Sequence, residues 1–127
     1  MSRSPESRAR LPGSQSAHSS TLKACKDLLE LHGIPATRVG QTASFHRDGT
    51  YYSGTDKGTW DLHATLPPHG ATCWIEVKSG NGQLTSEQRA FKVAQERAGA
   101  WCVVARSVDD LAEVVRAVKA LERAVTG

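Results

Sequence analysis

Two short segments of alternating residues constrain the fold of this chain more than any other feature. In residues 60–66 apolar side chains occupy every second position, and residues 72–78 repeat the alternation. The sequence Pro67-Pro68-His69-Gly70 separates the two segments and is typical of a turn. Because side chains in a strand point alternately to opposite faces, we predict an antiparallel β-hairpin with one apolar face.

The other face of this hairpin carries charge. Glu76 and Lys78 lie two residues apart, so both point away from the apolar face that Val77 joins. Asp61 comes from the first strand, and pairing of the strands can bring its carboxylate close to Glu76. Two carboxylates beside an amine suit a divalent cation and the hydrolysis of a phosphodiester. The tripeptide Glu-x-Lys alone more often marks only the solvated face of a strand.

Apolar periodicity and turn residues predict the remaining elements. Before the hairpin we expect a helix at residues 20–32, a short strand at 35–39 and a long loop or ragged hairpin at 40–59. After it we expect a helix from a capping box at 85–88 to Ala98, and a buried strand at 101–105 with Trp101 in the core. The last predicted helix, at 108–124, has an inner apolar stripe of Leu111, Val114, Val115, Val118 and Leu121. This order predicts an α/β fold, in which helices flank a small mixed β-sheet.

Composition indicates one domain and an N-terminal tail. The chain has 127 residues, 39% of them hydrophobic, which is enough for one modest core. Residues 1–19 are rich in Ser, Arg, Pro and Gly, so we predict a disordered basic tail there and a single domain at 20–127. Without a secretory signal or a membrane-length apolar run, we expect a soluble, cytoplasmic protein. The net charge of +3 is compatible with a polyanionic partner but does not require one.

The three cysteines lie inside apolar segments rather than in CxxC pairs. Cys25, Cys73 and Cys102 therefore fit buried thiols in a reducing compartment, and a reactive thiol is the alternative.

From about Leu22 to Leu121 the chain resembles the VRR-NUC (virus-type replication-repair nuclease) family of the PD-(D/E)XK nuclease superfamily. The matching segments are Gly58-Thr59-Trp60-Asp61-Leu62, Ile75-Glu76-Val77-Lys78, the stretch at 82–88 that ends in Gln88, and the stretch at 98–111. The resemblance implies a restriction-endonuclease-like core, a divalent metal, a DNA substrate and a homodimer.

The resemblance also implies roles for individual residues. Asp61, Glu76 and the backbone carbonyl of Val77 would bind Mg²⁺ or Mn²⁺. Lys78 would orient or deprotonate the attacking water, and Gln88 would position Lys78 or that water. The chain departs from the family in its first helix, where a glutamate is usual. The aligned region, His18-Ser19-Ser20-Thr21, holds no acidic residue, and a water or His18 is the substitute that we expect.

Other polar residues have a simpler first interpretation. We expect His46, His63 and His69 at the surface or beside the site, with His63 the candidate among them because it shares the face of Asp61. Trp74 is predicted to pack next to Glu76. Five basic residues are candidates for contacts with phosphates around the site, and simple solvation is the alternative for each. They are Arg38, Arg47, Lys57, Arg89 and Lys92.

Three hypotheses about function follow. The first is a Mg²⁺- or Mn²⁺-dependent DNA endonuclease that cuts branched DNA, such as a Holliday junction or a flap, during replication, recombination or repair. The second is a non-catalytic nucleic-acid-binding module of the same fold with an impaired metal site. The third is cleavage of plain duplex or single-stranded DNA with no preference for junctions.

Overall fold

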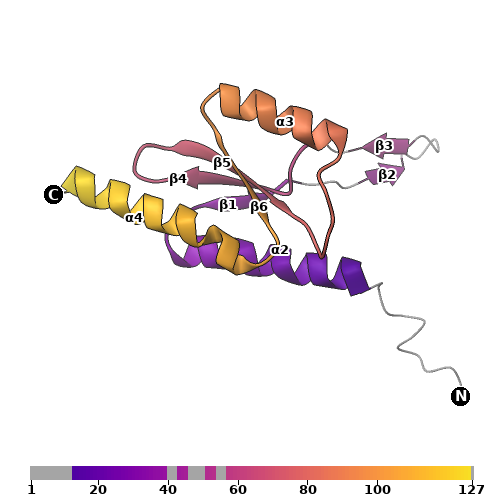
Figure 1. Cartoon of the computed structure of the whole chain (residues 1–127), viewed down its shortest axis with the longest axis horizontal. Helices are drawn as coiled ribbons and strands as arrows, with labels where there is room; N and C mark the ends of the chain where they lie inside the picture. The colour runs from indigo at the N-terminus through magenta and orange to yellow at the C-terminus, as the bar shows by residue number, and fades with distance from the viewer. Residues whose placement is uncertain (1–12, 40–42, 46–50, 54–56, 127) are drawn as a thin grey trace, which may run out of the picture.

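A mixed four-stranded sheet lies at the centre of the molecule (Figure 1). The computed structural model describes residues 13–39, 43–45, 51–53 and 57–126. The strands follow the spatial order β1 (Ala36–Arg38), β4 (Leu62–Leu66), β5 (Ala71–Val77) and β6 (Trp101–Ala105). β4 is antiparallel to both β1 and β5, whereas β6 is parallel to β5. The predicted small mixed sheet is confirmed.

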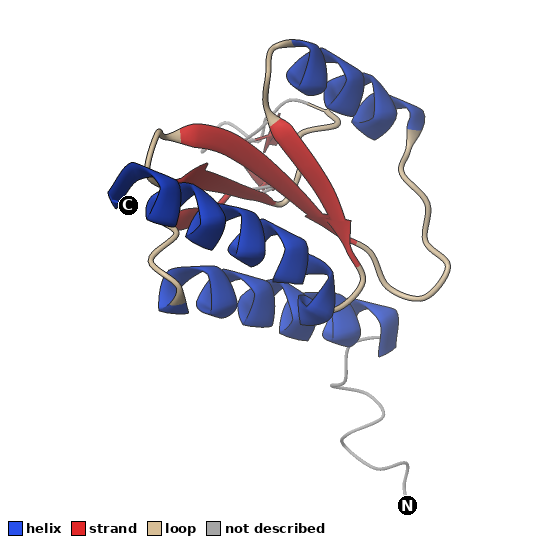
Figure 2. Ribbon diagram, turned by 60° about the vertical axis from the view of Figure 1, so that its left-hand side comes forward, coloured by secondary structure: helices blue, strands red, loops and turns tan. Residues whose placement is uncertain are grey.

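Helices cover both faces of this sheet. α2 (Gly13–Leu31) and α4 (Ala112–Thr126) lie on one face, with the short 3₁₀ helix η1 (Val108–Leu111) leading into α4. α3 (Ser86–Arg97) lies on the opposite face and makes the crossover between the parallel strands β5 and β6 (Figure 2). The result is a three-layer α/β architecture, as predicted.

A second sheet of two antiparallel strands lies apart from the first. β2 (Ala43–Phe45) pairs with β3 (Tyr51–Ser53), so the hairpin alternative for residues 40–59 is correct where the structure describes this segment. Residues 40–42, 46–50 and 54–56 lie outside the described residues.

The β4–β5 hairpin supplies the centre of the hydrophobic core. Leu62 pairs with Ile75 and Ala64 pairs with Cys73, which confirms the predicted antiparallel hairpin with one apolar face. The apolar face of the hairpin is at most 1% exposed and packs against Leu22, Cys25 and Leu29 of α2 and Val114 and Val118 of α4. Each fully buried aliphatic side chain contributes about 1.5–3 kcal/mol to folding, so this layer holds α2 and α4 against the sheet.

α3 docks on the other face through aromatic contacts rather than through fully buried residues of its own. Phe91 lies between two tryptophans, with ring centroids 6.3 Å from Trp60 and 5.0 Å from Trp74. The indole N–H of Trp60 donates to the backbone carbonyl of Gln88 at 3.1 Å, and that of Trp74 donates to the Gln95 side chain at 2.9 Å. Trp74 therefore packs against α3, and the hydrogen bond from Trp60 to Gln88 holds the first turn of that helix. The predicted packing of Trp74 next to Glu76 stays a prediction.

Some boundaries differ from the sequence predictions. α2 begins at Gly13, so residues 13–19 are helical where we predicted a disordered tail, and residues 1–12 lie outside the described residues. Extending an existing helix costs less than starting one, because each further residue gains a hydrogen bond without a new nucleation step. Asp61, predicted inside the first strand of the hairpin, lies immediately before β4.

Two apolar residues assigned to the core are partly exposed. Trp101 is 36% exposed because it begins β6, an edge strand with a neighbour on one side only. Leu121 is 38% exposed in the distal half of α4, although Leu111, Val114 and Val118 are buried as predicted.

The three cysteines are free thiols, and Cys25 and Cys73 are buried. Burial raises the pKa of Cys25 to about 11 and that of Cys73 to about 12, so both stay protonated at neutral pH. Burial also raises the pKa of the half-buried Cys102. These environments favour thiols acting as small hydrophobic residues over reactive thiolates. Among the described helices, none combines the length and apolar character needed to cross a bilayer.

Candidate active site

The register of the hairpin brings Asp61 and Glu76 together at the end of the sheet. Leu62 pairs with Ile75, so the next residues toward this end of the two strands are Asp61 and Glu76. The backbone N–H of Asp61 donates to Glu76 Oε1 at 3.2 Å, and the N–H of Val77 donates to Asp61 Oδ2 at 2.9 Å. Backbone N–H groups of the two adjoining segments thus hold both carboxylates at the same end of the sheet.

Lys78 and Gln88 meet at the second oxygen of Glu76. Lys78 directly follows β5, and its Nζ lies 3.4 Å from Glu76 Oε2. Gln88, in the first turn of α3, donates from Nε2 to the same oxygen at 2.8 Å. The structure therefore gathers the four side chains Asp61, Glu76, Lys78 and Gln88. Gln88 hydrogen-bonds to Glu76 and not to Lys78. It can therefore position Lys78 only indirectly, through Glu76 Oε2, which both side chains contact.

The site combines buried negative charge with limited access to solvent. Glu76 is 4% exposed, whereas the side chains of Asp61 and Lys78 are 15% and 17% exposed. Burial, and after it the negative charge of Asp61, raise the pKa of Glu76 to about 7, although Lys78 partly opposes both effects. When Asp61 and Glu76 are both ionised, the positive charge of Lys78 balances only one of them. A bound cation would neutralise the remaining negative charge.

The donor set fits a hard divalent cation. Mg²⁺ and Mn²⁺ prefer carboxylate, carbonyl and water oxygens, and Asp61, Glu76 and the Val77 carbonyl provide such oxygens at one end of the sheet. Within the described ranges, no three His, Cys, Asp or Glu side chains already form a group able to hold a metal ion. An ion here would therefore need donors besides the carboxylate pair, such as backbone and water oxygens.

α2 contributes one further side chain to the site. His18 Nε2 lies 3.2 Å from Asp61 Oδ2, and the His18 side chain is 36% exposed. These residues are 43 positions apart, so no local pattern could have shown the contact. The one signal in the sequence was the lack of an acidic residue in the segment that includes His18. His63 instead packs edge-on against Trp74, with centroids 4.8 Å apart, which supports a packing role.

The candidate phosphate contacts have different surroundings. Arg38 is exposed at the end of β1, and Val39 next to it donates its N–H to the Asp61 carbonyl at 2.9 Å. Arg89 is also exposed, and its guanidinium donates to the Leu84 carbonyl at 2.6 Å. Arg38 and Arg89 are therefore exposed and lie next in sequence to Val39 and Gln88, which contact Asp61 and Glu76.

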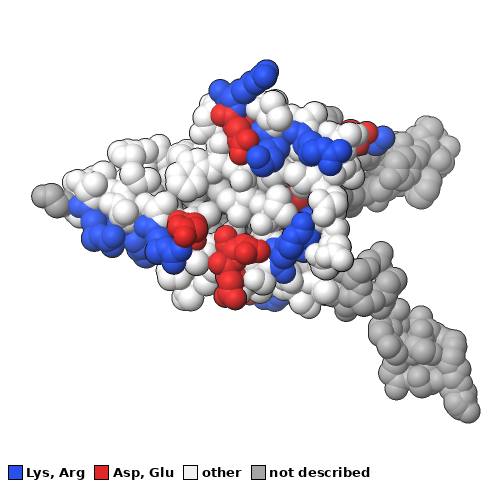
Figure 3. Space-filling view, in the orientation of Figure 1, with Lys and Arg blue, Asp and Glu red and all other residues white. Residues whose placement is uncertain are grey.

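The remaining basic candidates are less available. Lys57 lies 3.8 Å from Glu87, and Lys92 lies 3.1 Å from Glu96, so both are paired with a carboxylate. Arg47 lies outside the described residues. The sequence prediction overlooked Arg106, whose guanidinium donates to the Gly80 carbonyl at 2.9 Å and anchors the loop that follows Lys78. On the face in Figure 3, basic side chains form separate patches over α3 and α4 rather than one continuous surface.

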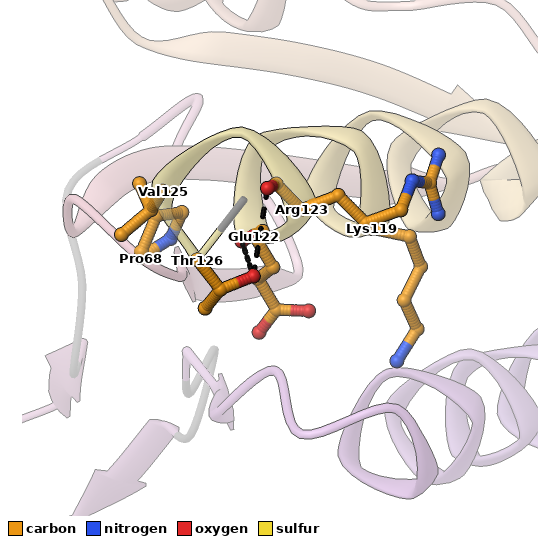
Figure 4. A pocket seen from close by; sticks show the side chains of 6 residues that line it. All are labelled: Pro68, Lys119, Glu122, Arg123, Val125 and Thr126. Atoms are coloured by element: carbon orange, nitrogen blue, oxygen red, sulfur yellow. Dashed lines mark hydrogen bonds between the residues drawn. The ribbon is translucent and has the colours of Figure 1, made fainter.

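A hollow lined by residues of the hairpin turn and α4 is separate from this site. It has a volume of about 400 Å³ and is lined by Pro68, Lys119, Glu122, Arg123, Val125 and Thr126 (Figure 4). The Thr126 hydroxyl donates to the Glu122 carbonyl at 3.0 Å, so part of its polar lining is already satisfied. None of the gathered site residues lines it.

Comparison with known proteins places this arrangement in a known fold. A solved structure titled a VRR_NUC domain superposes with a TM-score of 0.57 over 79% of this chain and 95% of its own, at 20% sequence identity. This chain has the fold of a VRR_NUC domain. The sequence itself matches no family model and no curated protein. The resemblance predicted from the motifs is therefore supported by three-dimensional structure, and the VRR_NUC fold is what brings those motifs together here.

Proposed function

We propose that this chain is a metal-dependent DNA endonuclease that hydrolyses phosphodiester bonds. One observation carries the proposal. The buried carboxylate of Glu76 lies beside Asp61, and its Oε2 is contacted by both Lys78 Nζ and Gln88 Nε2. Metal-assisted hydrolysis of a phosphodiester needs carboxylates to hold the metal and a group nearby that acts on the attacking water. Asp61 and Glu76 supply the carboxylates, and the amine of Lys78 lies next to Glu76. The VRR_NUC fold is consistent with this chemistry.

Each residue has a role in the proposed reaction. Asp61 and Glu76, with the Val77 carbonyl, would hold Mg²⁺ or Mn²⁺. When bound, the ion would neutralise phosphate charge and lower the pKa of bound water. Lys78 would orient or deprotonate the attacking water from its 17% exposed position. Gln88 would keep Glu76 Oε2 in place, so that the carboxylate does not turn away from the ion.

We further propose that the substrate is branched DNA, such as a Holliday junction or a flap, in replication, recombination or repair. A domain this small has little surface with which to contact base edges, so shape and backbone are the features open to it. Arg38 and Arg89, both exposed, are the candidate phosphate contacts. A homodimer would present two sites to the paired strands of a junction.

A second candidate function is a non-catalytic nucleic-acid-binding module. The observation that favours it is the lack, within the described ranges, of three acidic, histidine or cysteine side chains able to hold a metal as a group. Such a module would keep the exposed basic side chains and bind DNA without cutting it.

One experiment separates these functions. Purified protein is incubated with a four-way junction, a flap and a linear duplex, each in Mg²⁺, Mn²⁺ or EDTA, and binding and cleavage are both measured. The proposal expects metal-dependent cuts, strongest on branched DNA, that disappear in Asp61→Asn and Lys78→Met. Binding without such cuts would support the module, and equal cutting of all substrates would remove the preference for branches. Unchanged cutting by both variants would exclude these residues from the reaction.

A further inference from the structure

His18 has a position that the roles above leave unexplained. His18 lies on α2, and its Nε2 is 3.2 Å from Asp61 Oδ2. The same oxygen already accepts the backbone N–H of Val77 at 2.9 Å, which is enough to orient the carboxylate. A second donor is therefore not needed to hold Asp61 in place.

The chemistry of imidazole gives this contact another use. A neutral histidine carries one N–H, which can move from Nε2 to Nδ1 and leave a lone pair on Nε2. With a metal bound, the ion would take the place of the proton between Nε2 and the carboxylate. Two ligand atoms at right angles, each about 2.1 Å from an ion, lie about 3.0 Å apart, close to the observed separation of 3.2 Å.

We propose that His18 binds the catalytic metal directly through Nε2, alongside Asp61, and so favours Mn²⁺ over Mg²⁺; the inference rests on the proposed metal-dependent function. Imidazole is a common ligand of transition metals, whereas Mg²⁺ strongly prefers oxygen. The exposed fraction of His18, 36%, leaves its ring free to adjust toward an ion without disturbing the core. α2 thereby contributes a donor that neither strand of the hairpin can supply.

Pulsed electron paramagnetic resonance of bound Mn²⁺ tests this directly, because a coordinated imidazole nitrogen couples to the electron spin of the metal. The protein is prepared with ¹⁴N- or ¹⁵N-labelled histidine, and Mn²⁺ and Mg²⁺ dissociation constants are measured by calorimetry without DNA. His18→Gln removes the ring while its amide can still donate to Asp61. His63→Gln is the matched control, because His63 lies near the site but packs against Trp74. Asp61→Asn tests the site itself.

The expected result is a histidine nitrogen coupling in wild type and His63→Gln that is lost in His18→Gln. We also expect Mn²⁺ binding about 10-fold weaker in His18→Gln, with a smaller change for Mg²⁺. Mn²⁺ binding that requires Asp61 but shows no histidine coupling, or a coupling that survives in His18→Gln, would overturn the role of His18 and leave the proposed function intact. If no Mn²⁺ binding depends on Asp61, both proposals fail.

Discussion

Gln88 connects the start of α3 to the buried carboxylate of Glu76. Its Nε2 donates to Glu76 Oε2 at 2.8 Å, while its Oε1 accepts the backbone N–H of Thr85 at 3.0 Å. Thr85 Oγ1 accepts the backbone N–H of Gln88 at 3.1 Å, which completes the capping box. One side chain therefore serves both the helix terminus and the site, and substitution can separate the two roles.

Gln88→Glu should impair the site more than the helix. Glutamate can still accept the Thr85 N–H as a capping-box partner, but it replaces the amide that donates to Glu76 with a second carboxylate. Losing a donor to a buried acceptor costs about 1–3 kcal/mol, so we expect a loss of that size in urea unfolding at pH 8 in EDTA. Cleavage should fall at least about 10-fold, since Glu76 is no longer held in place.

Thr85→Ala is the matched control for this variant. It removes the cap and costs about 1 kcal/mol of stability, but it leaves the amide of Gln88 free to donate to Glu76. Cleavage should therefore stay within a few-fold of wild type. If Thr85→Ala slows cleavage as much as Gln88→Glu does, the effect belongs to the helix terminus and not to the contact with Glu76.

Glu76→Gln should remove a pH dependence of stability from the metal-free protein. Burial and the charge of Asp61 raise the pKa of Glu76 from 4.5 to about 7, so the folded state favours its protonated form. That contribution is fully present below about pH 4.5 and is lost as the pH rises through about 7. The shift corresponds to a loss of about 3 kcal/mol by pH 8, relative to a neutral side chain.

Urea unfolding in EDTA at pH 5 and pH 8 measures most of this difference, because pH 5 lies only slightly above the ordinary pKa of 4.5. We expect the free energy of unfolding of wild type to fall relative to Glu76→Gln between the two values, because the amide remains neutral at both. Parallel behaviour of the two proteins would show that Glu76 titrates normally in the folded state.

Lys78→Met should abolish most cleavage while DNA binding stays within a few-fold of wild type. Methionine keeps much of the aliphatic stem but removes the amine that lies 3.4 Å from Glu76 Oε2. A positioned acid or base contributes about 10²–10⁴-fold to rate, and we expect a loss in that range. Single-turnover cleavage of a junction in Mn²⁺ measures the rate, and a gel-shift assay in Ca²⁺ measures binding.

Lys92→Met is the control for the loss of positive charge. Lys92 pairs with Glu96 on α3, at 3.1 Å, and does not contact Glu76. Its removal should change cleavage less than about 3-fold. A similar loss in both variants would indicate that general charge, and not the position of Lys78, sets the rate.

Gly58→Ala should destabilise the fold more than Gly70→Ala. Both glycines have positive φ, +86° and +81°, where a side chain costs about 1–2 kcal/mol. A Cβ at Gly58 would also lie 2.6 Å from the backbone oxygen of Glu87, next to Gln88, whereas a Cβ at Gly70 meets nothing within 4 Å. Thermal unfolding should show the larger loss for Gly58→Ala, together with reduced cleavage. Equal losses would mean that α3 shifts freely and does not hold Gln88 in place.

Local sequence determined the hairpin and the acidic pair that it carries. Alternation fixed which side chains of residues 62–66 and 73–77 face the core, because the strand period is two. The short turn at 67–70 set the register, so Asp61 and Glu76 had to meet once the strands paired. The capping box at Thr85 was equally visible, since its hydrogen bonds link residues three positions apart.

Tertiary packing decided what lies around that pair. The contact between His18 and Asp61 depends on how α2 crosses the sheet, which is set by the burial of Leu22, Cys25 and Leu29 against the hairpin. The partner of Gln88 likewise depends on the docking of α3 through Phe91. Periodicity specifies which face of an element is apolar, but it does not specify where along a neighbour that face comes to rest. Side chains from separate elements therefore met at the site only because the core fixed their positions.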